Sequence, residues 1–511
     1  MTDTSANNKR IAKNTLLLYI RMLFLMAVSL YTSRVVLQAL GVEDFGIYNV
    51  VGGVVAMFGF LNAAMSSSTQ RYLTFELGRG DMSRLRTVFC TSVNIHALIS
   101  LVIVLLAETI GLWFFYQKMI IPEERLNAAM WVYQYSVLSS VVMVMSVPYN
   151  ASIIAHERMS AFAYISILEV LLKLLIVFLL QVVSWDRLAF YAFLVFLVQL
   201  GIRFIYGIYC RKHFKETAFR WLWDKVMFRE MLSFAGWNLW GNCAGVAFTQ
   251  GINLLLNMFF GPVVNAARGI AVQVQSAVQQ FSLNFQTAVN PQITKSYAVQ
   301  DYGYMHSLIF RSSKFTFFLL LFLSLPVMLE TETILRLWLK TVPEHTVVFL
   351  RLMLCVAIID GVANPLMVSA AATGRVRLYQ GVVGGILLCI LPLSYLVLKM
   401  GGSPSSVFVV HLCVCVVAFM VRLYIIRPMI RLSLTAYFRQ IVIPCLSVAS
   451  VSFLLPFLVI LFLQESFWRF LLTTVTCLVS ISVAAYCWGL NSSERQFVSD
   501  RLQLIISKFR R

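Results

Sequence analysis

The sequence predicts an all-α polytopic membrane protein with about 14 transmembrane helices. Of its 511 residues, 60% are hydrophobic and only 12% are charged, a composition too apolar for a soluble domain with an ordinary polar surface. Apolar stretches of about 20 residues, the length that crosses the hydrocarbon core, recur along the whole chain. Weak internal repetition arranges these predicted helices into two similar lobes.

The predicted spans follow one another with short connections. They cover approximately residues 14–38, 44–66, 87–108, 128–149, 160–183, 188–210, 232–256, 263–289, 307–329, 345–369, 376–398, 404–426, 440–463 and 467–489. Lys9, Arg10 and Lys13 precede the first span as they would in a signal peptide. The apolar run is too long for one and no small-residue cleavage pattern follows it, so we expect a retained helix.

Basic residues indicate the orientation of the chain. The net charge is +19, and Lys and Arg gather in connections on one side of the predicted membrane. The opposite side holds only Lys118, Arg125, Arg187, Arg336, Lys340, Lys399 and Arg469. This asymmetry fits the positive-inside rule with both termini in the cytoplasm, and it gives no indication of nucleic acid binding.

Two pairs of segments carry the repetition. A nearly constant offset superposes "LGVEDFG" (40–46) on "FGPVVNA" (260–266) and "VPYNASIIAHER" (147–158) on "NPLMVSAAATGR" (364–375). Because helix order is preserved, we predict two six-helix lobes. The predicted domains are an N-terminal lobe (1–210), a basic cytoplasmic linker (211–231), a C-terminal lobe (232–426), two additional transmembrane helices (427–490) and a basic amphipathic cytoplasmic tail (491–511).

The segment 263–293 is rich in Asn and Gln although it is long enough to span the membrane. On a helical wheel, one polar stripe contains Arg268, Gln275, Gln279, Ser282 and Gln286, and a second contains Gln273, Gln280 and Asn284. Unpaired polar groups cost several kcal/mol each in hydrocarbon, so we expect these faces to line a hydrated cavity. Hydrogen bonding between helices is the alternative interpretation. The remaining sector, with Val274, Val278, Phe281 and Phe285, is predicted to face lipid.

Ionisable residues within spans are candidates for function. The predicted substrate-binding residues are Arg21, Arg34, Lys173, Arg268 and Arg351, with the amides Asn242, Asn253, Gln275, Gln279 and Gln286. Glu169 and Asp360 are the candidates for coupling to a proton or sodium gradient. Glu169 lies one turn before Lys173, so a purely structural ion pair is equally compatible. The excess of cations predicts an anionic substrate, and a pyrophosphate head group suits Arg and Lys.

No sequence pattern predicts catalysis. The ten cysteines and six histidines are scattered, without CxxC or metal-ligand spacing, and the predicted outer loops are short. We therefore expect no enzyme activity, no metal and no cofactor.

The stretches "SRVVLQALGVEDFGIYNVVGGVVAMFGFLN" (33–62), "SSSTQRYLTFELGRGD" (66–81) and "GPVVNAARGIAVQV" (261–274) resemble polysaccharide biosynthesis proteins. These are the lipid-linked oligosaccharide flippases of the multidrug/oligosaccharidyl-lipid/polysaccharide exporter superfamily. The resemblance covers essentially the whole chain. It implies a V-shaped pair of bundles in the bacterial inner membrane that moves undecaprenyl-diphosphate-linked oligosaccharides to the outer leaflet by alternating access. Membrane lipids and the polysaccharide polymerase machinery are the further partners it implies.

Relatives that handle peptidoglycan precursors are implied to use arginines on the first, second and eighth spans. Arg21, Arg34 and Arg268 lie in comparable places, but the second span here has no basic residue. The alternative function is a multidrug or small-molecule cation antiporter of the same superfamily. That branch resembles proteins with a carboxylate in the first helix of a lobe, and spans 14–38 and 232–256 contain none.

Overall fold

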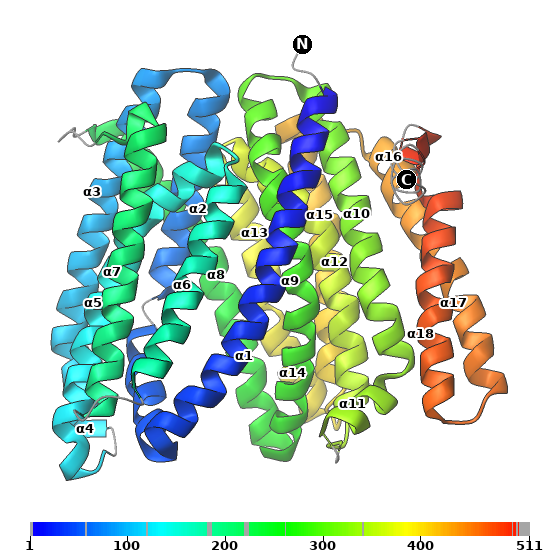
Figure 1. Cartoon of the computed structure of the whole chain (residues 1–511). Coiled ribbons are helices and arrows are strands. Elements are labelled where there is room, and N and C mark those ends of the chain that lie inside the picture. The colour runs from blue at the N-terminus through cyan, green and yellow to red at the C-terminus, as the bar shows by residue number, and fades with distance from the viewer. Residues whose placement is uncertain are drawn as a thin grey trace, which may run out of the picture. The chain divides into compact units, whose positions relative to one another are not determined.

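The computed structural model describes residues 4–56, 59–118, 121–180, 186–218, 224–260, 262–339, 342–492, 494–496 and 499. Within these ranges the chain is mainly α-helical and contains no strand (Figure 1). The predicted all-α class is confirmed. The predicted tail 491–511 lies mostly outside the described residues.

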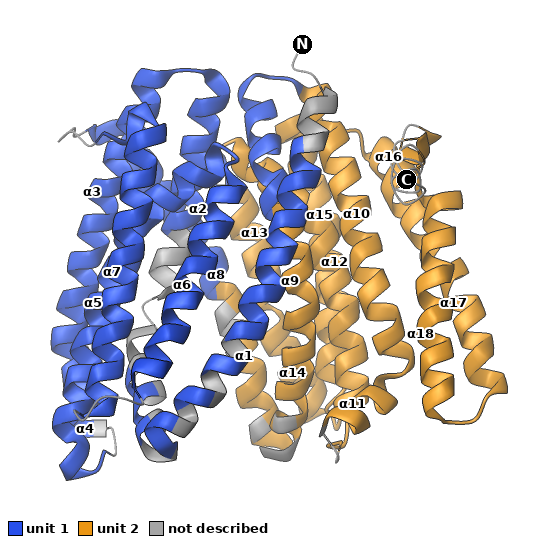
Figure 2. Ribbon diagram, viewed as in Figure 1, with its two compact units in different colours: residues 1–243, 287–301, 374–377 blue, residues 244–286, 302–373, 378–511 orange. Residues whose placement is uncertain are grey.

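The helices divide between two compact units (Figure 2). Unit 1 comprises residues 1–243, 287–301 and 374–377, and unit 2 comprises residues 244–286, 302–373 and 378–511. Helices α8 and α9 each contribute residues to both units. The lobe boundaries predicted from the repeats remain predictions.

The helices have the following bounds. The first seven are α1 (Thr4–Ala56), α2 (Gly59–Arg79), α3 (Met82–Leu106), α4 (Leu112–Lys118), α5 (Leu126–Ala155), α6 (Met159–Leu179) and α7 (Arg187–His213). Next come α8 (Lys225–Phe260), α9 (Pro262–Ala298), α10 (Tyr302–Leu329), α11 (Thr331–Leu339), α12 (Thr346–Ala372), α13 (Arg377–Leu388) and α14 (Ile390–Lys399). The last four are α15 (Ser406–Ile430), α16 (Leu434–Tyr437), α17 (Ile443–Phe462) and α18 (Phe467–Ala484).

Eleven of the described helical stretches are long and apolar enough to cross a membrane. The chain is therefore a multi-pass integral membrane protein, while the exact number of 14 spans stays a prediction. Helix α9 is not among the eleven, because its many amides lower its hydropathy. Helix α1 is interrupted at Gly41, whose φ of 80° and ψ of 169° are not helical. Glycine adopts this conformation readily, and the break falls between the first two predicted spans.

In unit 1, α5 packs against α1, α2, α3 and α7. Helix α5 contributes Ala129, Val132 and Tyr133 to the hydrophobic core of this unit, and all three are fully buried. The Tyr133 hydroxyl donates a hydrogen bond of 2.7 Å to the carbonyl oxygen of Ala107. A buried tyrosine with a satisfied hydroxyl stabilises both by apolar burial and by fixing the ring.

In unit 2, α12 packs against α10 and α15, and α17 and α18 form a pair attached to α10. Two buried ion pairs make this attachment. Lys314 Nζ lies 2.6 Å from Glu494 Oε2, and Arg469 Nε lies 3.1 Å from Glu330 Oε1. Buried charges are tolerated when paired in this way, so α18 is fixed to α10 at both of its ends.

Candidate functional site

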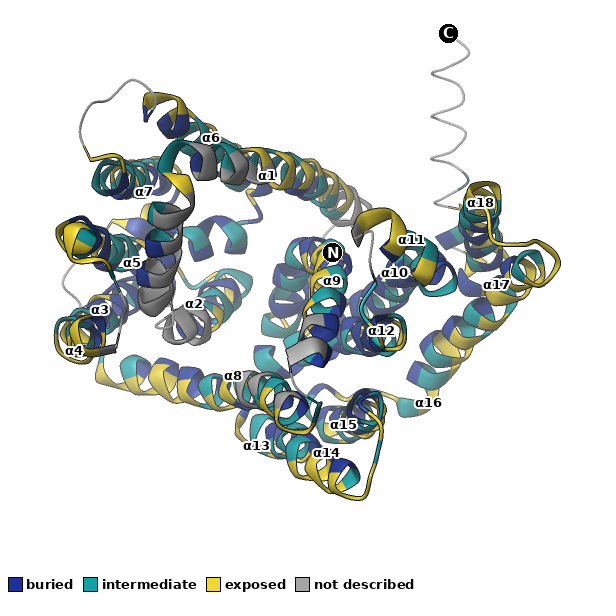
Figure 3. Cartoon of the chain, turned by 90° about the horizontal axis from the view of Figure 1, so that it is seen from below, coloured by how far each residue is buried: buried dark blue, intermediate teal, exposed yellow. Residues whose placement is uncertain are grey.

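Helix α9 has one exposed face and one buried face. Figure 3 shows buried, intermediate and exposed parts along α9. The residues Gly269, Gln273, Ser276, Gln280 and Leu283 are exposed and recur every three or four residues, so they lie along one side of the helix. Four of them are polar or glycine, at positions where a lipid-facing helix carries large apolar side chains. Since lipid offers no hydrogen-bond partners, we expect this exposed face to contact water.

The buried face carries the stripe of Arg268. Relative exposure is 6% for Arg268, 3% for Ser282 and 3% for Gln286. Val278, with 7% exposure, belongs to the hydrophobic core of unit 2 and Val274 packs against that core. The prediction that the Val274 and Val278 sector faces lipid is therefore wrong. A helical wheel gives relative angles only, and it could not show that core residues of α10 and α12 pack on this side.

The buried stripe connects α9 to its neighbours within unit 2. The Arg268 guanidinium donates to Asn253 Oδ1 and, at 3.0 Å, to the carbonyl oxygen of Thr249 on α8. Gln275 Nε2 donates to the carbonyl oxygen of Met353 at 3.2 Å. Gln286 Nε2 donates in the same way to α12, at Gly361 (3.1 Å). Gln279 is half-buried. Gln275 and Gln286 therefore form hydrogen bonds between helices, which is the alternative interpretation of this polar stripe.

Arg268 has only neutral hydrogen-bond partners. Asn253 and the Thr249 carbonyl are uncharged, and no carboxylate lies within ion-pair distance among the residues that the structure describes. Its Nε is buried and has no hydrogen-bond partner in the described part of the chain. Isolated charges are costly in a medium of low polarity, so this guanidinium is a centre of uncompensated positive charge inside unit 2.

The other predicted basic residues differ in the groups that stabilise their positive charge. Arg21 lies 4.5 Å from the centroid of the Phe162 ring, a cation–π contact, whereas Lys173 Nζ forms an ion pair of 2.6 Å with Glu169. Arg351 is exposed, and its Nε donates to the carbonyl oxygen of Met328 at 2.8 Å. Asn242 is exposed. The side chain of Arg34 lies outside those that the structure describes.

Asp360 has a charged partner that the sequence analysis did not identify. Arg422 Nη1 of α15 lies 3.6 Å from Asp360 Oδ1 of α12. Arg422 is only 5% exposed. Arg422 lies near the end of the predicted span 404–426. The pair joins a half-buried carboxylate of α12, 42% exposed, to a buried arginine of α15.

A second missed feature is a polar cluster around Glu157 in unit 1. Glu157 follows α5, and its side chain is 0% exposed. Its carboxylate accepts hydrogen bonds from Gln292 Nε2 at 2.5 Å and Lys295 Nζ at 2.6 Å, both on α9. Arg10 Nε of α1 lies 2.9 Å from the same carboxylate. We call these four residues the Glu157 cluster. It fixes the last segment of α9 to α1 and to the end of α5.

The same segment of α9 also approaches α2 closely. A Cβ atom on Gly78 would lie 2.9 Å from the Cα atom of Lys295, so a larger residue does not fit without movement. Pro291 lies inside α9 and cannot donate a hydrogen bond to the carbonyl of Thr287. Thr287 is also the first residue of α9 that belongs to unit 1. The helix is thus weakened where it passes from one unit to the other.

We expect the exposed face of α9 to be hydrated, and cysteine labelling checks this. In a background without native cysteines, Gln280→Cys should react with a small water-soluble maleimide about tenfold faster than Val417→Cys, because a thiolate requires water. Val417 is 53% exposed on an apolar face of α15 and serves as the lipid-facing control. Equal labelling rates at the two positions would contradict a hydrated face on α9.

Structural comparison identifies similar solved proteins. A multidrug resistance MATE family transporter of the MOP superfamily, solved in an outward-facing conformation, has a TM-score of 0.70 and 13% identity, with 83% of this chain and 96% of that chain covered. A MATE crystal structure in the bent conformation has a TM-score of 0.70 and 14% identity, with 85% of this chain and 96% of that chain covered. A MOP superfamily transporter from Pyrococcus furiosus has a TM-score of 0.69 and 14% identity, with 84% of this chain and 96% of that chain covered.

No family model matches the sequence. No curated protein matches it either. The likeness to the solved proteins establishes the fold, which is that of MATE transporters of the MOP superfamily.

Proposed function

We propose that this protein is a flippase that moves a lipid diphosphate-linked oligosaccharide, with undecaprenol as the lipid, from the inner to the outer leaflet by alternating access. The substrate serves surface polysaccharide assembly. Two features support the proposal: a fold shared with MOP superfamily transporters, and a long helix, α9, with an exposed polar face. Sugars rich in hydroxyl groups suit the exposed amides of Gln273 and Gln280.

The observation that carries the proposal is the uncompensated charge of Arg268. A guanidinium that is 6% exposed and whose hydrogen-bond partners among the described residues are Asn253 and the Thr249 carbonyl favours an anionic ligand. Phosphate oxygens match the planar donor fork of arginine. His411 of α15 also interacts electrostatically with Arg268, and a diphosphate would offset that local positive field.

The fold fits a multidrug transporter equally well, and the charge distribution is what favours the flippase. A cation antiporter requires a negative site for its substrate, whereas Asp360 is paired with Arg422 and Glu169 with Lys173. The Pyrococcus protein is titled as having a binding pocket of reverse polarity that suggests a different function. A positive site in this fold is therefore compatible with a substrate other than a cationic drug.

The Glu157 cluster supplies a means of alternating access. The last segment of α9 is held in unit 1 by Glu157 while the rest of α9 belongs to unit 2. Any movement of residues 244–286 must then bend α9 near Pro291 or release the cluster. We assign Pro291 to the bending and Glu157 to the attachment.

Deleting the gene in its native cell tests the function. The flippase proposal expects loss of a surface glycan and accumulation of its lipid-linked precursor, with unchanged susceptibility to cationic drugs. Increased drug susceptibility with an intact glycan profile would instead establish the antiporter.

Coupling to an ion gradient makes a separate prediction at Asp360. Asp360→Asn alone leaves the buried Arg422 without its carboxylate. Because the Asp360 side chain is 42% exposed, the cost in stability is below the roughly 3–5 kcal/mol of a fully buried pair. The double variant Asp360→Asn with Arg422→Gln removes both charges and separates folding from coupling. If Asp360 carries the coupling ion, export should fall about tenfold or more in the double variant at a normal protein level. Glu169→Gln with Lys173→Gln tests the second candidate carboxylate in the same way. Full activity in both double variants would place coupling elsewhere.

A further inference from the structure

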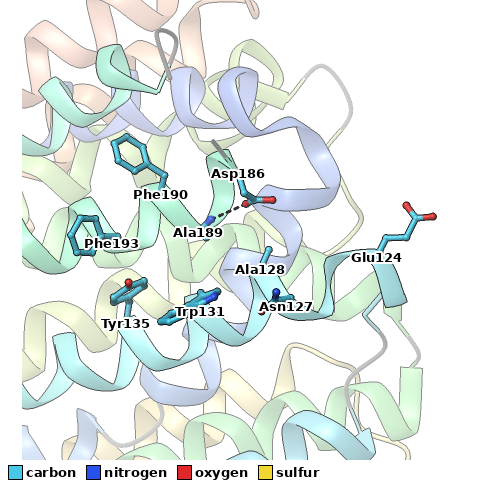
Figure 4. A pocket seen from close by; sticks show the side chains of 9 residues that line it. All are labelled: Glu124, Asn127, Ala128, Trp131, Tyr135, Asp186, Ala189, Phe190 and Phe193. Atoms are coloured by element: carbon cyan, nitrogen blue, oxygen red, sulfur yellow. Dashed lines mark hydrogen bonds between the residues drawn. The ribbon is translucent and has the colours of Figure 1, made fainter. Parts of the chain in front are cut away.

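Unit 1 contains a pocket of about 570 Å³ between the beginnings of α5 and α7. Figure 4 shows its lining. Four aromatic side chains form its walls, with Trp131 and Tyr135 on α5 and Phe190 and Phe193 on α7. The pocket is separate from Arg268 and from the Glu157 cluster, and the proposed function uses neither its aromatic nor its acidic residues.

The aromatic walls are ordered by mutual contacts. The Trp131 and Tyr135 rings are stacked with centroids 5.7 Å apart, and the Tyr135 and Phe193 rings are 5.4 Å apart. Trp131 is nevertheless 52% exposed, so one large ring is open to a ligand. Along α5, Trp131 lies two turns beyond Glu124, a distance of about 10 Å. The pocket therefore extends from the ends of the helices to a depth at which lipid chains are found.

The mouth of the pocket is acidic. Asp186 Oδ1 accepts hydrogen bonds from the backbone N–H groups of Leu188 and Ala189 at 3.0 Å, and Asp186 Oδ2 lies 2.6 Å from Arg125 Nη1. Arg125 also pairs with Asp44. Arg125 thus forms ion pairs with two carboxylates, Asp44 and Asp186, and one negative charge of this group is not neutralised.

Glu124 adds a further carboxylate to this mouth. It lines the pocket, is exposed, and has no ion-pair partner among the residues that the structure describes. Figure 4 shows it on the same side as Asn127, whose side chain also lines the pocket. A ligand at this position meets negative charge first and aromatic rings behind it.

We propose that this pocket binds an outer-leaflet phospholipid with a primary ammonium head group, phosphatidylethanolamine. The predicted orientation places the beginnings of α5 and α7 at the outer surface, where the head groups lie. An ammonium group matches both the carboxylates at the mouth and the faces of aromatic rings, which attract cations. The acyl chains then extend along Trp131 and Phe193. Charge excludes the proposed transport substrate from this pocket, because its diphosphate would face Glu124 and Asp186.

Native mass spectrometry of the purified full chain tests the site, with phosphatidylethanolamine and phosphatidylglycerol added in turn. We expect the ethanolamine lipid to bind about tenfold more tightly, Glu124→Gln to remove that preference, and Trp131→Ala to weaken the binding of both lipids. Glu123→Gln and Trp468→Ala are matched controls, since these residues do not line the pocket, and both should keep the preference. Glu124 is exposed, so its variant tests the site even if Trp131→Ala folds poorly.

Three outcomes would overturn the proposal. The first is equal affinity of the wild-type protein for the two lipids. The second is an unchanged preference in Glu124→Gln. The third is displacement of the lipid by free ethanolamine at equal concentration, which would assign the pocket to a soluble amine.

Discussion

Replacing Arg268 with alanine should abolish glycan export. The guanidinium offers a charged donor fork for a phosphate, and hydrogen bonds to charged groups contribute about 1.5–3 kcal/mol each. Losing one or two of them corresponds to a decrease in export of at least roughly tenfold to a hundredfold. Surface glycan, quantified by lectin binding in a deletion strain that carries the variant, measures this effect.

Two further variants distinguish binding from folding at this position. Arg268 also fastens α9 to α8 through Asn253, so alanine removes a structural contact together with the charge. Arg268→Gln keeps a donor for Asn253 and loses the charge, and it should be as inactive as alanine. Arg268→Lys keeps the charge but not the fork, and it should retain part of the export. Normal export in Arg268→Gln at a normal protein level would contradict a role in phosphate binding.

Replacing Glu157 with glutamine should release the end of α9 from unit 1. Arg10 and Lys295 would then lie near each other without their shared carboxylate. Both cations are partly exposed, at 48% and 24%, which reduces the penalty below that of a fully buried pair. We expect a shift of about 2 kcal/mol, or roughly thirtyfold, towards the released state.

Thiol labelling of Thr294→Cys reports this release. Thr294 is 5% exposed, so its cysteine should be protected in the parent protein and should react with maleimide once Glu157→Gln is added. Glu169→Gln, which breaks the Lys173 ion pair elsewhere in unit 1, is the matched control and should leave Thr294→Cys protected. Exchanging the charges, with Glu157→Lys and Lys295→Glu, should restore protection. Continued protection in Glu157→Gln would show that the cluster does not hold α9.

The fold class could be predicted because membrane helices have a strong local signature. Span length and hydropathy depend on about 20 consecutive residues, and the break at Gly41 falls where the sequence separates two spans. The polar character of α9 was equally visible. What the sequence could not supply was the direction of its faces, because that depends on which helices pack against it. The buried position of Val278 follows from α10 and α12, not from α9 itself.

The site residues show the same division between local and distant information. The Glu169 and Lys173 pair is local, with its partners four positions apart, and this spacing indicated the pair. Glu157 meets Lys295 across 138 residues, and Asp360 meets Arg422 on another helix. No spacing rule connects such partners. A signal did exist for Glu157, since a carboxylate at the end of a membrane helix requires a cation or water nearby.

Transbilayer movement of the lipid-linked substrate is the most direct test of the account. The purified protein would be reconstituted in vesicles with a fluorescent undecaprenyl-diphosphate-linked oligosaccharide in both leaflets, and a membrane-impermeant quencher would be added outside. The account predicts that the wild-type protein exposes nearly all of the fluorescent lipid to the quencher, while Arg268→Gln and protein-free vesicles leave about half of it protected, because a bilayer divides the lipid equally between its leaflets. Equal protection in wild-type and protein-free vesicles, with the protein shown to be folded, would contradict the proposed flippase.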